Sequence, residues 1–155
     1  MKKNLNETLK IGLLLFAGLV LSRLLPLPAN SEPLLGLAVL APYLTRNTLA
    51  FLFPLAVMFV SDAIIGFHDS MLMTYSALAI APFVSKLIDN KYTALLGSWL
   101  VWHVLANTAQ VFPPFSAEAL VFDLRLLGSG LVVLMLYDIL GKLWQTRSQG
   151  LLQKQ

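Results

Sequence analysis

The sequence predicts an all-α integral membrane protein, a six-helix transmembrane bundle in a single domain that covers residues 1–155. Three observations lead to this fold class. Of the 155 residues, 57% are hydrophobic and 12% are charged, and the mean hydropathy is +0.75, whereas soluble domains carry about 25% charged residues. Apolar segments follow one another with only short polar or proline-containing breaks. Positive charges gather at alternate breaks, which is typical of a chain that crosses a membrane repeatedly.

The first apolar segment, residues 11–27, runs into a proline-containing stretch at 26–30 that prevents continuation of a helix. A cleaved signal peptide is the alternative, because lysines precede the segment, but the apolar run is long and contains Arg23. The second segment, residues 33–44, contains Pro42 and is too short for a straight crossing. We expect it to be kinked or packed against its neighbours.

The remaining segments are each long enough to approach a full crossing. Residues 48–67 and 71–88 each contain one internal proline, which neighbouring helices can accommodate in a membrane. Residues 93–112 are rich in tryptophan and polar groups and stop at two consecutive prolines. Residues 119–144 form the longest segment, and residues 145–155 are polar enough to form a cytoplasmic tail.

The positive charges fix an orientation. With six crossings both termini lie on one side, and nine of the 11 Lys and Arg residues then share that side. By the positive-inside rule this side is the cytoplasm, so the basic pI near 9.3 needs no nucleic-acid partner. The nine residues are Lys2, Lys3, Lys10, Arg46, Lys86, Lys91, Lys142, Arg147 and Lys154.

The fifth segment carries a polar stripe. Trp99, His103, Asn107 and Gln110 are spaced by four, four and three residues, which places them on one face of a helix. A lipid-facing surface does not carry such groups, so this face points into the bundle. The stripe either lines a pocket, together with Trp102, or makes hydrogen bonds that hold helices together.

Four further charged residues fall near the outer ends of the segments: Arg23, Asp62, Asp123 and Arg125. A charge inside a membrane is costly, by about 2.5–3.5 kcal/mol at a helix centre, so these residues need partners or water. Arg23 is expected to pair with Asp62 or with Asp123, and Arg23–Asp62 is taken as the structural ion pair. The predicted ligand-binding residues are Asp62, Trp99, Trp102, His103, Asn107, Gln110, Asp123 and Arg125.

Catalysis and metal binding have little support in the sequence. There is no cysteine, and neither a G-x-S-x-G elbow nor an H-E-x-x-H pair occurs. His68, Asp69 and His103 are the candidates for metal ligands, but their spacing is not a ligand motif. We therefore expect no enzyme activity, no metal and no cofactor.

Two stretches carry a resemblance to known proteins. Residues 23–30, RLLPLPAN, and residues 53–62, FPLAVMFVSD, with Gly66-Phe67-His68 after them, resemble a family of small uncharacterised bacterial membrane proteins. That family is similar in span count and helix order to the substrate-binding S components of energy-coupling factor (ECF) vitamin transporters. The resemblance implies a multi-pass protein of the bacterial cytoplasmic (inner) membrane whose outward-facing pocket captures a vitamin or related micronutrient.

The resemblance also implies a partner, an energy-coupling transmembrane subunit with two ATPases, because no Walker motif is present in this sequence. One departure is that small residues spaced by four, used for docking in S components, are replaced around Ala17 by Leu13 and Leu21. The alternative function is a non-transporting scaffold or accessory subunit of the MreD kind, in which the polar residues only join helices. A pocket demands empty volume beside the stripe, whereas a scaffold demands direct contacts.

Overall fold

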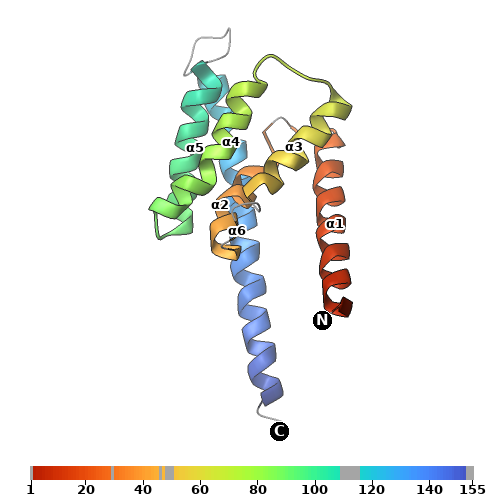
Figure 1. The fold of residues 1–155 in the computed structure, drawn as a ribbon. Coiled ribbons are helices and arrows are strands. Elements are labelled where there is room, and N and C mark those ends of the chain that lie inside the picture. Colours follow the sequence, from red (N-terminus) through yellow and green to blue (C-terminus); the bar gives the residue numbers. More distant parts are fainter. Residues whose placement is uncertain (1, 29, 46, 48–50, 109–115, 153–155) are drawn as a thin grey trace.

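The computed structural model describes residues 2–28, 30–45, 47, 51–108 and 116–152, which form six α-helices and no strands (Figure 1). This confirms the prediction of an all-helical chain with six helices. The helices are α1 (Lys2–Leu24), α2 (Leu34–Leu44), α3 (Leu52–Ile65), α4 (Met71–Leu87), α5 (Lys91–Thr108) and α6 (Ala117–Leu152).

Two helix boundaries differ from the prediction. Helix α1 begins at Lys2 instead of residue 11, and α6 continues to Leu152, so the expected tail at 145–155 is helical over most of its length. Hydropathy marks where a segment stops being apolar, but Lys, Glu and Gln are good helix formers and let the helix run on. At about 1.5 Å per residue, the 36 residues of α6 span roughly 54 Å.

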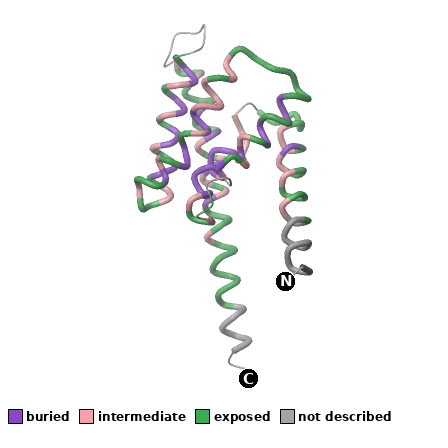
Figure 2. Tube along the Cα trace, viewed as in Figure 1, coloured by how far each residue is buried: buried purple, intermediate pink, exposed green. Residues whose placement is uncertain are grey.

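The shortest helix is the centre of the fold. Helix α2 packs against α3, α4, α5 and α6, and seven of its 11 residues are buried. Figure 2 shows this concentration of buried residues, in contrast with the exposed residues 139–146 of α6. The second predicted segment, which is too short for a straight crossing, is therefore packed against its neighbours.

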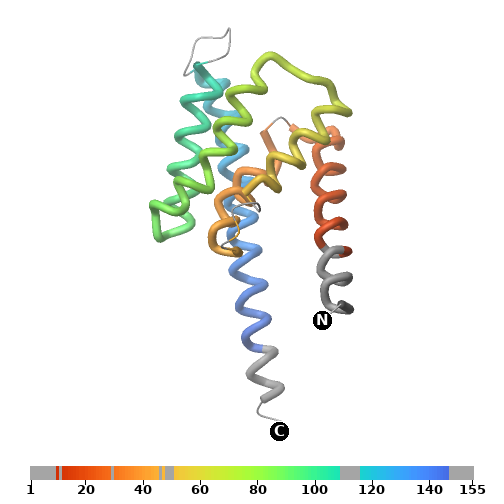
Figure 3. Tube along the Cα trace, in the orientation of Figure 1, coloured from red at the N-terminus to blue at the C-terminus, as the bar shows by residue number. Residues whose placement is uncertain are grey.

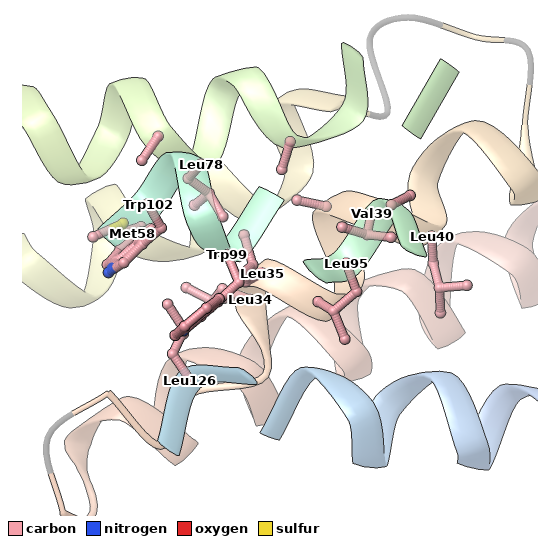
Figure 4. Packing of buried hydrophobic residues seen from close by; sticks show 14 of the residues in the cluster. Leu34, Leu35, Val39, Leu40, Met58, Leu78, Leu95, Trp99, Trp102 and Leu126 are labelled. Atoms are coloured by element: carbon pink, nitrogen blue, oxygen red, sulfur yellow. The ribbon is translucent and has the colours of Figure 1, made fainter. Parts of the chain in front are cut away.

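Side chains from five helices meet around α2. Leu35 and Val39 of α2, Leu78 of α4 and Leu95 of α5 are among the largest fully buried residues, and Trp99 and Trp102 lie in the same cluster (Figure 4). Met58 of α3 and Leu126 of α6 complete the set.

Glycines set the distance between α2 and α6. A Cβ placed on Gly36 would lie 2.8 Å from the Cα of Gly130, so the two backbones are nearly in contact. Gly128 has nothing within 4 Å of a Cβ. Of the two glycines in this part of α6, Gly130 is the one that the helix crossing requires.

Helix α1 stands apart from the central helices and packs mainly against the oblique helix α3. Helix α1 begins and α6 ends at the same end of the molecule (Figure 1). The connections from α1 to α2 and from α3 to α4 lie at the opposite end (Figure 3), called here the loop end.

One helix in the described part of the chain is long and apolar enough to cross a membrane. It is α6 over Ala117–Thr146, with a mean hydropathy of 2.0 in its most apolar window, of which 22% is buried. Four shorter apolar helical stretches accompany it, at Gly12–Leu24, Leu34–Leu44, Leu52–Ile65 and Met71–Leu87.

An ion pair ties α5 to α6 away from the loop end. Lys91 Nζ lies 2.9 Å from Asp138 Oδ1, and the Tyr92 hydroxyl donates a hydrogen bond of 2.7 Å to Asp138 Oδ2. The hydrogen bond with Asp138 raises the pKa of Lys91, so this amine stays protonated at neutral pH.

Candidate functional site

A buried ion pair joins α1 to α3. Arg23, in the last turn of α1, places Nη2 at 2.7 Å from Asp62 Oδ1, so the pair named from the sequence is present. Tyr75 of α4 donates a hydrogen bond of 2.8 Å to Asp62 Oδ2. Asp62 is only 1% exposed, and a buried carboxylate is stable there because both of its oxygens are bonded. Glu32 Oε1 lies 3.7 Å from Arg23 Nη1 as a second acidic neighbour.

A second polar cluster joins α5 to α6 around Asp123, which is also buried. Asp123 Oδ2 is bonded to His103 Nδ1 at 2.5 Å and accepts a hydrogen bond of 2.8 Å from Asn107 Nδ2. Trp99 Nε1 donates to the Asp123 carbonyl oxygen at 2.6 Å and its ring stacks on His103. The helical spacing of the stripe therefore brings three of its members onto one residue of the neighbouring helix.

The loop between α1 and α2 is fastened over the bundle. Asn30 adopts a left-handed backbone conformation with φ of 61°, which Asn tolerates better than most residues. Its amide nitrogen lies 3.3 Å from Asp123 Oδ1 as a donor. Ser129 of α6 donates a hydrogen bond of 2.8 Å to the carbonyl oxygen of Glu32. These bonds hold Asn30 and Glu32 beside the two polar clusters.

A cavity of about 360 Å³ lies between the two clusters. This volume is within the range of small-molecule sites, which is about 300–1,000 Å³. Its wall combines charged, amide, hydroxyl and aromatic groups from α1, α3, α4, α5, α6 and the loops that join α1 to α2 and α3 to α4. The lining residues are Arg23, Asn30, Glu32, Met58, His68, Ser70, Thr74, Trp102, Ala106, Asn107, Ala119, Phe122 and Asp123.

Two buried donors at this wall have no hydrogen-bond partner within the described part of the chain. They are Trp102 Nε1 and Arg23 Nε. Trp102 is 7% exposed, and an unpartnered buried donor costs roughly 1–3 kcal/mol. Trp99, one turn earlier on the same helix and equally buried at 8% exposure, has its N–H fully engaged.

The structure sorts the predicted ligand-binding residues into three groups. Trp102, Asn107 and Asp123 line the cavity. Asp62, Trp99 and His103 are buried behind its wall and contact other side chains or backbone. Arg125 is exposed, with its guanidinium 5.2 Å from the Phe122 ring centre, and does not line the cavity. Gln110 lies outside the described residues.

The metal candidates do not assemble. Over the residues that the structure describes, no group of three or more His, Asp or Glu side chains is close enough to hold a metal ion. His103 is bonded to Asp123, whereas His68 is exposed at the cavity and its Nδ1 lies 2.9 Å from Ser70 Oγ. Asp69 is exposed in the same loop.

Some site residues are absent from the predicted set. Glu32 lies in a loop, where a charged side chain is normally solvated, yet it lines the cavity beside Arg23. Tyr75 and Thr74 occur in the first turn and a half of an apolar segment, where their hydroxyl groups were a usable signal. Asn30 carried no periodic signal, because it lies in a loop.

Comparison with known proteins assigns the chain to a family whose function is unknown. Searches of curated proteins and of solved structures each found no match. The model of DUF6580, described as a family of unknown function, matches residues 3–122. Because this match covers most of the chain, the protein belongs to the DUF6580 family.

Proposed function

We propose that this protein is a membrane-embedded substrate-binding subunit, similar in role to an S component, that takes up a vitamin or related small micronutrient. The observation that carries the proposal is the cavity of about 360 Å³ between two buried polar clusters. In the proposed arrangement all six helices lie in the bacterial cytoplasmic membrane, both termini are cytoplasmic, and the loop end faces outward.

The surface supports placement in lipid. Large apolar side chains are exposed on every helix, among them Leu14, Leu72, Leu87 and Trp144. Monomeric soluble proteins rarely expose contiguous apolar patches of more than a few hundred square ångströms. The shared end of α1 and α6 agrees with an even number of crossings.

The mechanism follows from the position of the cavity. A ligand enters at the loop end, and the fastened loop with Asn30 and Glu32 limits the access of water. Asn107 and Asp123 offer polar contacts, whereas Trp102 and Phe122 offer apolar surface. Release to the cytoplasm requires reorientation of the bundle, with energy supplied by a coupling subunit and its ATPases.

A matched pair of variants tests binding. Ala119 lines the cavity and Ala117 is exposed two residues earlier on α6, so Ala119→Phe fills the cavity whereas Ala117→Phe leaves it open. Protein purified in lipid nanodiscs is analysed by mass spectrometry for small molecules. We expect the wild type and Ala117→Phe to retain one compound that Ala119→Phe loses. The absence of any co-purified compound, together with no thermal shift from a panel of vitamins, contradicts the proposal.

A non-transporting scaffold is the second candidate, because His103 and Asp62 are bonded directly to other side chains and do not line the cavity. A scaffold retains its function when the cavity is filled. Uptake of the identified compound by cells that carry wild-type, Ala117→Phe or Ala119→Phe protein separates the two candidates. Uptake that Ala119→Phe leaves unchanged favours the scaffold.

A further inference from the structure

We infer that the cavity is selective for a small organic cation that also carries a hydrogen-bond acceptor. This inference rests on the proposed function and names its substrate class. It depends on three features of the wall: an excess of carboxylates, aromatic faces, and a buried N–H group without a partner.

The charges at the cavity are unbalanced. Glu32 and Asp123 line the cavity, and Asp62 lies directly behind Arg23, the one guanidinium in its lining. The lining itself thus has two carboxylates and one guanidinium, and that guanidinium is already paired with Asp62. His68, also in the lining, is exposed to solvent and lies within hydrogen-bond distance of Ser70.

The two terminal nitrogens of Arg23 face carboxylates, and of its donors only the buried Nε has no partner within the described residues. Its Nη2 atom is 2.7 Å from Asp62 Oδ1 and its Nη1 atom is 3.7 Å from Glu32 Oε1. An anionic ligand would have to compete with Asp62, which is almost completely buried. Arg125 is exposed and stacked over Phe122, where water screens its charge.

The carboxylates at the wall retain capacity for a cation. Glu32 has a side chain that is 29% exposed, and its contact with Arg23 is long. Asp123 Oδ1 accepts a weak bond of 3.3 Å from Asn30, and a carboxylate oxygen can accept a second donor. Trp102 and Phe122 present aromatic groups in the same lining, and aromatic faces attract cations.

Trp102 defines the acceptor. Trp102 lines the cavity, and its Nε1 atom is buried and has no partner in the described part of the chain. A donor at such a position is satisfied by a ligand atom with a lone pair, such as a carbonyl oxygen or a heterocyclic nitrogen. The ligand class is therefore a cation with an acceptor on its ring or chain, not a purely hydrocarbon amine.

Pyridines of equal size test the charge. We would titrate 3-(aminomethyl)pyridine, 3-(hydroxymethyl)pyridine and pyridine-3-carboxylate into the nanodisc protein at pH 7.5 and follow binding by ligand-observed NMR. The amine is expected to bind at least about tenfold more tightly than the alcohol or the carboxylate. Benzylamine lacks the ring nitrogen and should bind the wild type less tightly than 3-(aminomethyl)pyridine does. The two amines should bind Trp102→Phe equally tightly.

Substitutions of lining residues test whether the cavity wall causes the preference for the amine. Glu32→Gln should weaken binding of the amine about tenfold, whereas Glu118→Gln, at an exposed position outside the lining, should not change it. Phe122→Leu changes an exposed residue of the lining and should also weaken binding of the amine selectively. This variant tests the inference if Glu32→Gln does not fold.

The outcomes separate this inference from the proposed function. Binding of the carboxylate or the alcohol as tightly as the amine overturns the charge selectivity and leaves small-molecule binding intact. If no pyridine binds, the charge of the compound that co-purifies decides: a cation supports the inference and an anion or neutral compound overturns it. The absence of both probe binding and a co-purified compound overturns the proposed function and this inference together.

Discussion

The same substitution at two tryptophans of α5 gives a sharp test of the site. Trp99 and Trp102 are equally buried, but Trp99 donates its N–H to the Asp123 carbonyl oxygen and Trp102 has no partner within the described residues. Replacing either one by Phe removes the N–H and shrinks the ring by the same amount. The packing loss is thus common to both variants, and the difference between them isolates the hydrogen bond.

The expected difference can be worked from the two environments. Trp99→Phe loses a hydrogen bond with a net value of about 0.5–1.5 kcal/mol. Trp102→Phe removes an unpartnered buried donor and so recovers roughly 1–3 kcal/mol. Trp102→Phe should therefore be more stable than Trp99→Phe by about 1.5–4.5 kcal/mol. For a chain of this size, that corresponds to a difference of roughly 3–18 °C in the unfolding midpoint.

Thermal unfolding of both variants in the same detergent, monitored by circular dichroism at 222 nm, measures this difference. Wild-type protein and a second preparation in nanodiscs serve as controls for the solvent. Equal midpoints for the two variants would refute the reasoning, because they would mean that the Trp102 N–H is satisfied in the folded protein. A midpoint of Trp102→Phe at or above that of the wild type is the strongest support.

Further predictions concern the framework around the cavity. Gly36→Ala should destabilise the fold by about 1–3 kcal/mol, because its Cβ would lie against the backbone of α6, whereas Gly128→Ala should stabilise it by up to about 1 kcal/mol. Both are measured by thermal unfolding, and equal effects would contradict the close crossing. Asp62→Asn should cost about 3–5 kcal/mol, because it leaves the Arg23 charge buried without its partner. Asp138→Asn removes an ion pair that water screens and should leave the unfolding midpoint little changed; a large loss there would contradict the small contribution expected of this partly exposed pair.

The helices were predictable because each apolar segment ends at a proline, a glycine or a charge. The central role of α2 was not, since a short apolar segment carries the same pattern whether it faces lipid or is wrapped by neighbours. The close approach of Gly36 and Gly130 shows the same limit. Two glycines separated by 94 positions give no periodic signal of their contact.

The polar stripe shows which part of a site can be predicted from the sequence. Helical spacing placed Trp99, His103 and Asn107 on one face, and the structure has all three buried on that face. The partner, Asp123, depends on how α5 and α6 cross, which spacing within one helix does not specify. The sequence places Glu32 in a loop, and loops are normally solvated, but the bond from Ser129 to its carbonyl oxygen holds Glu32 at the cavity.

The Arg23–Asp62 pair has a consequence for the order in which the protein is made. The two residues are 39 positions apart, and at about 5–20 residues per second Asp62 is synthesised roughly 2–8 s after Arg23. During this interval the guanidinium has no partner in α3 and must stay among water or lipid headgroups. In the proposed membrane arrangement, the end of α1 therefore becomes buried against α3 only after α3 has been made.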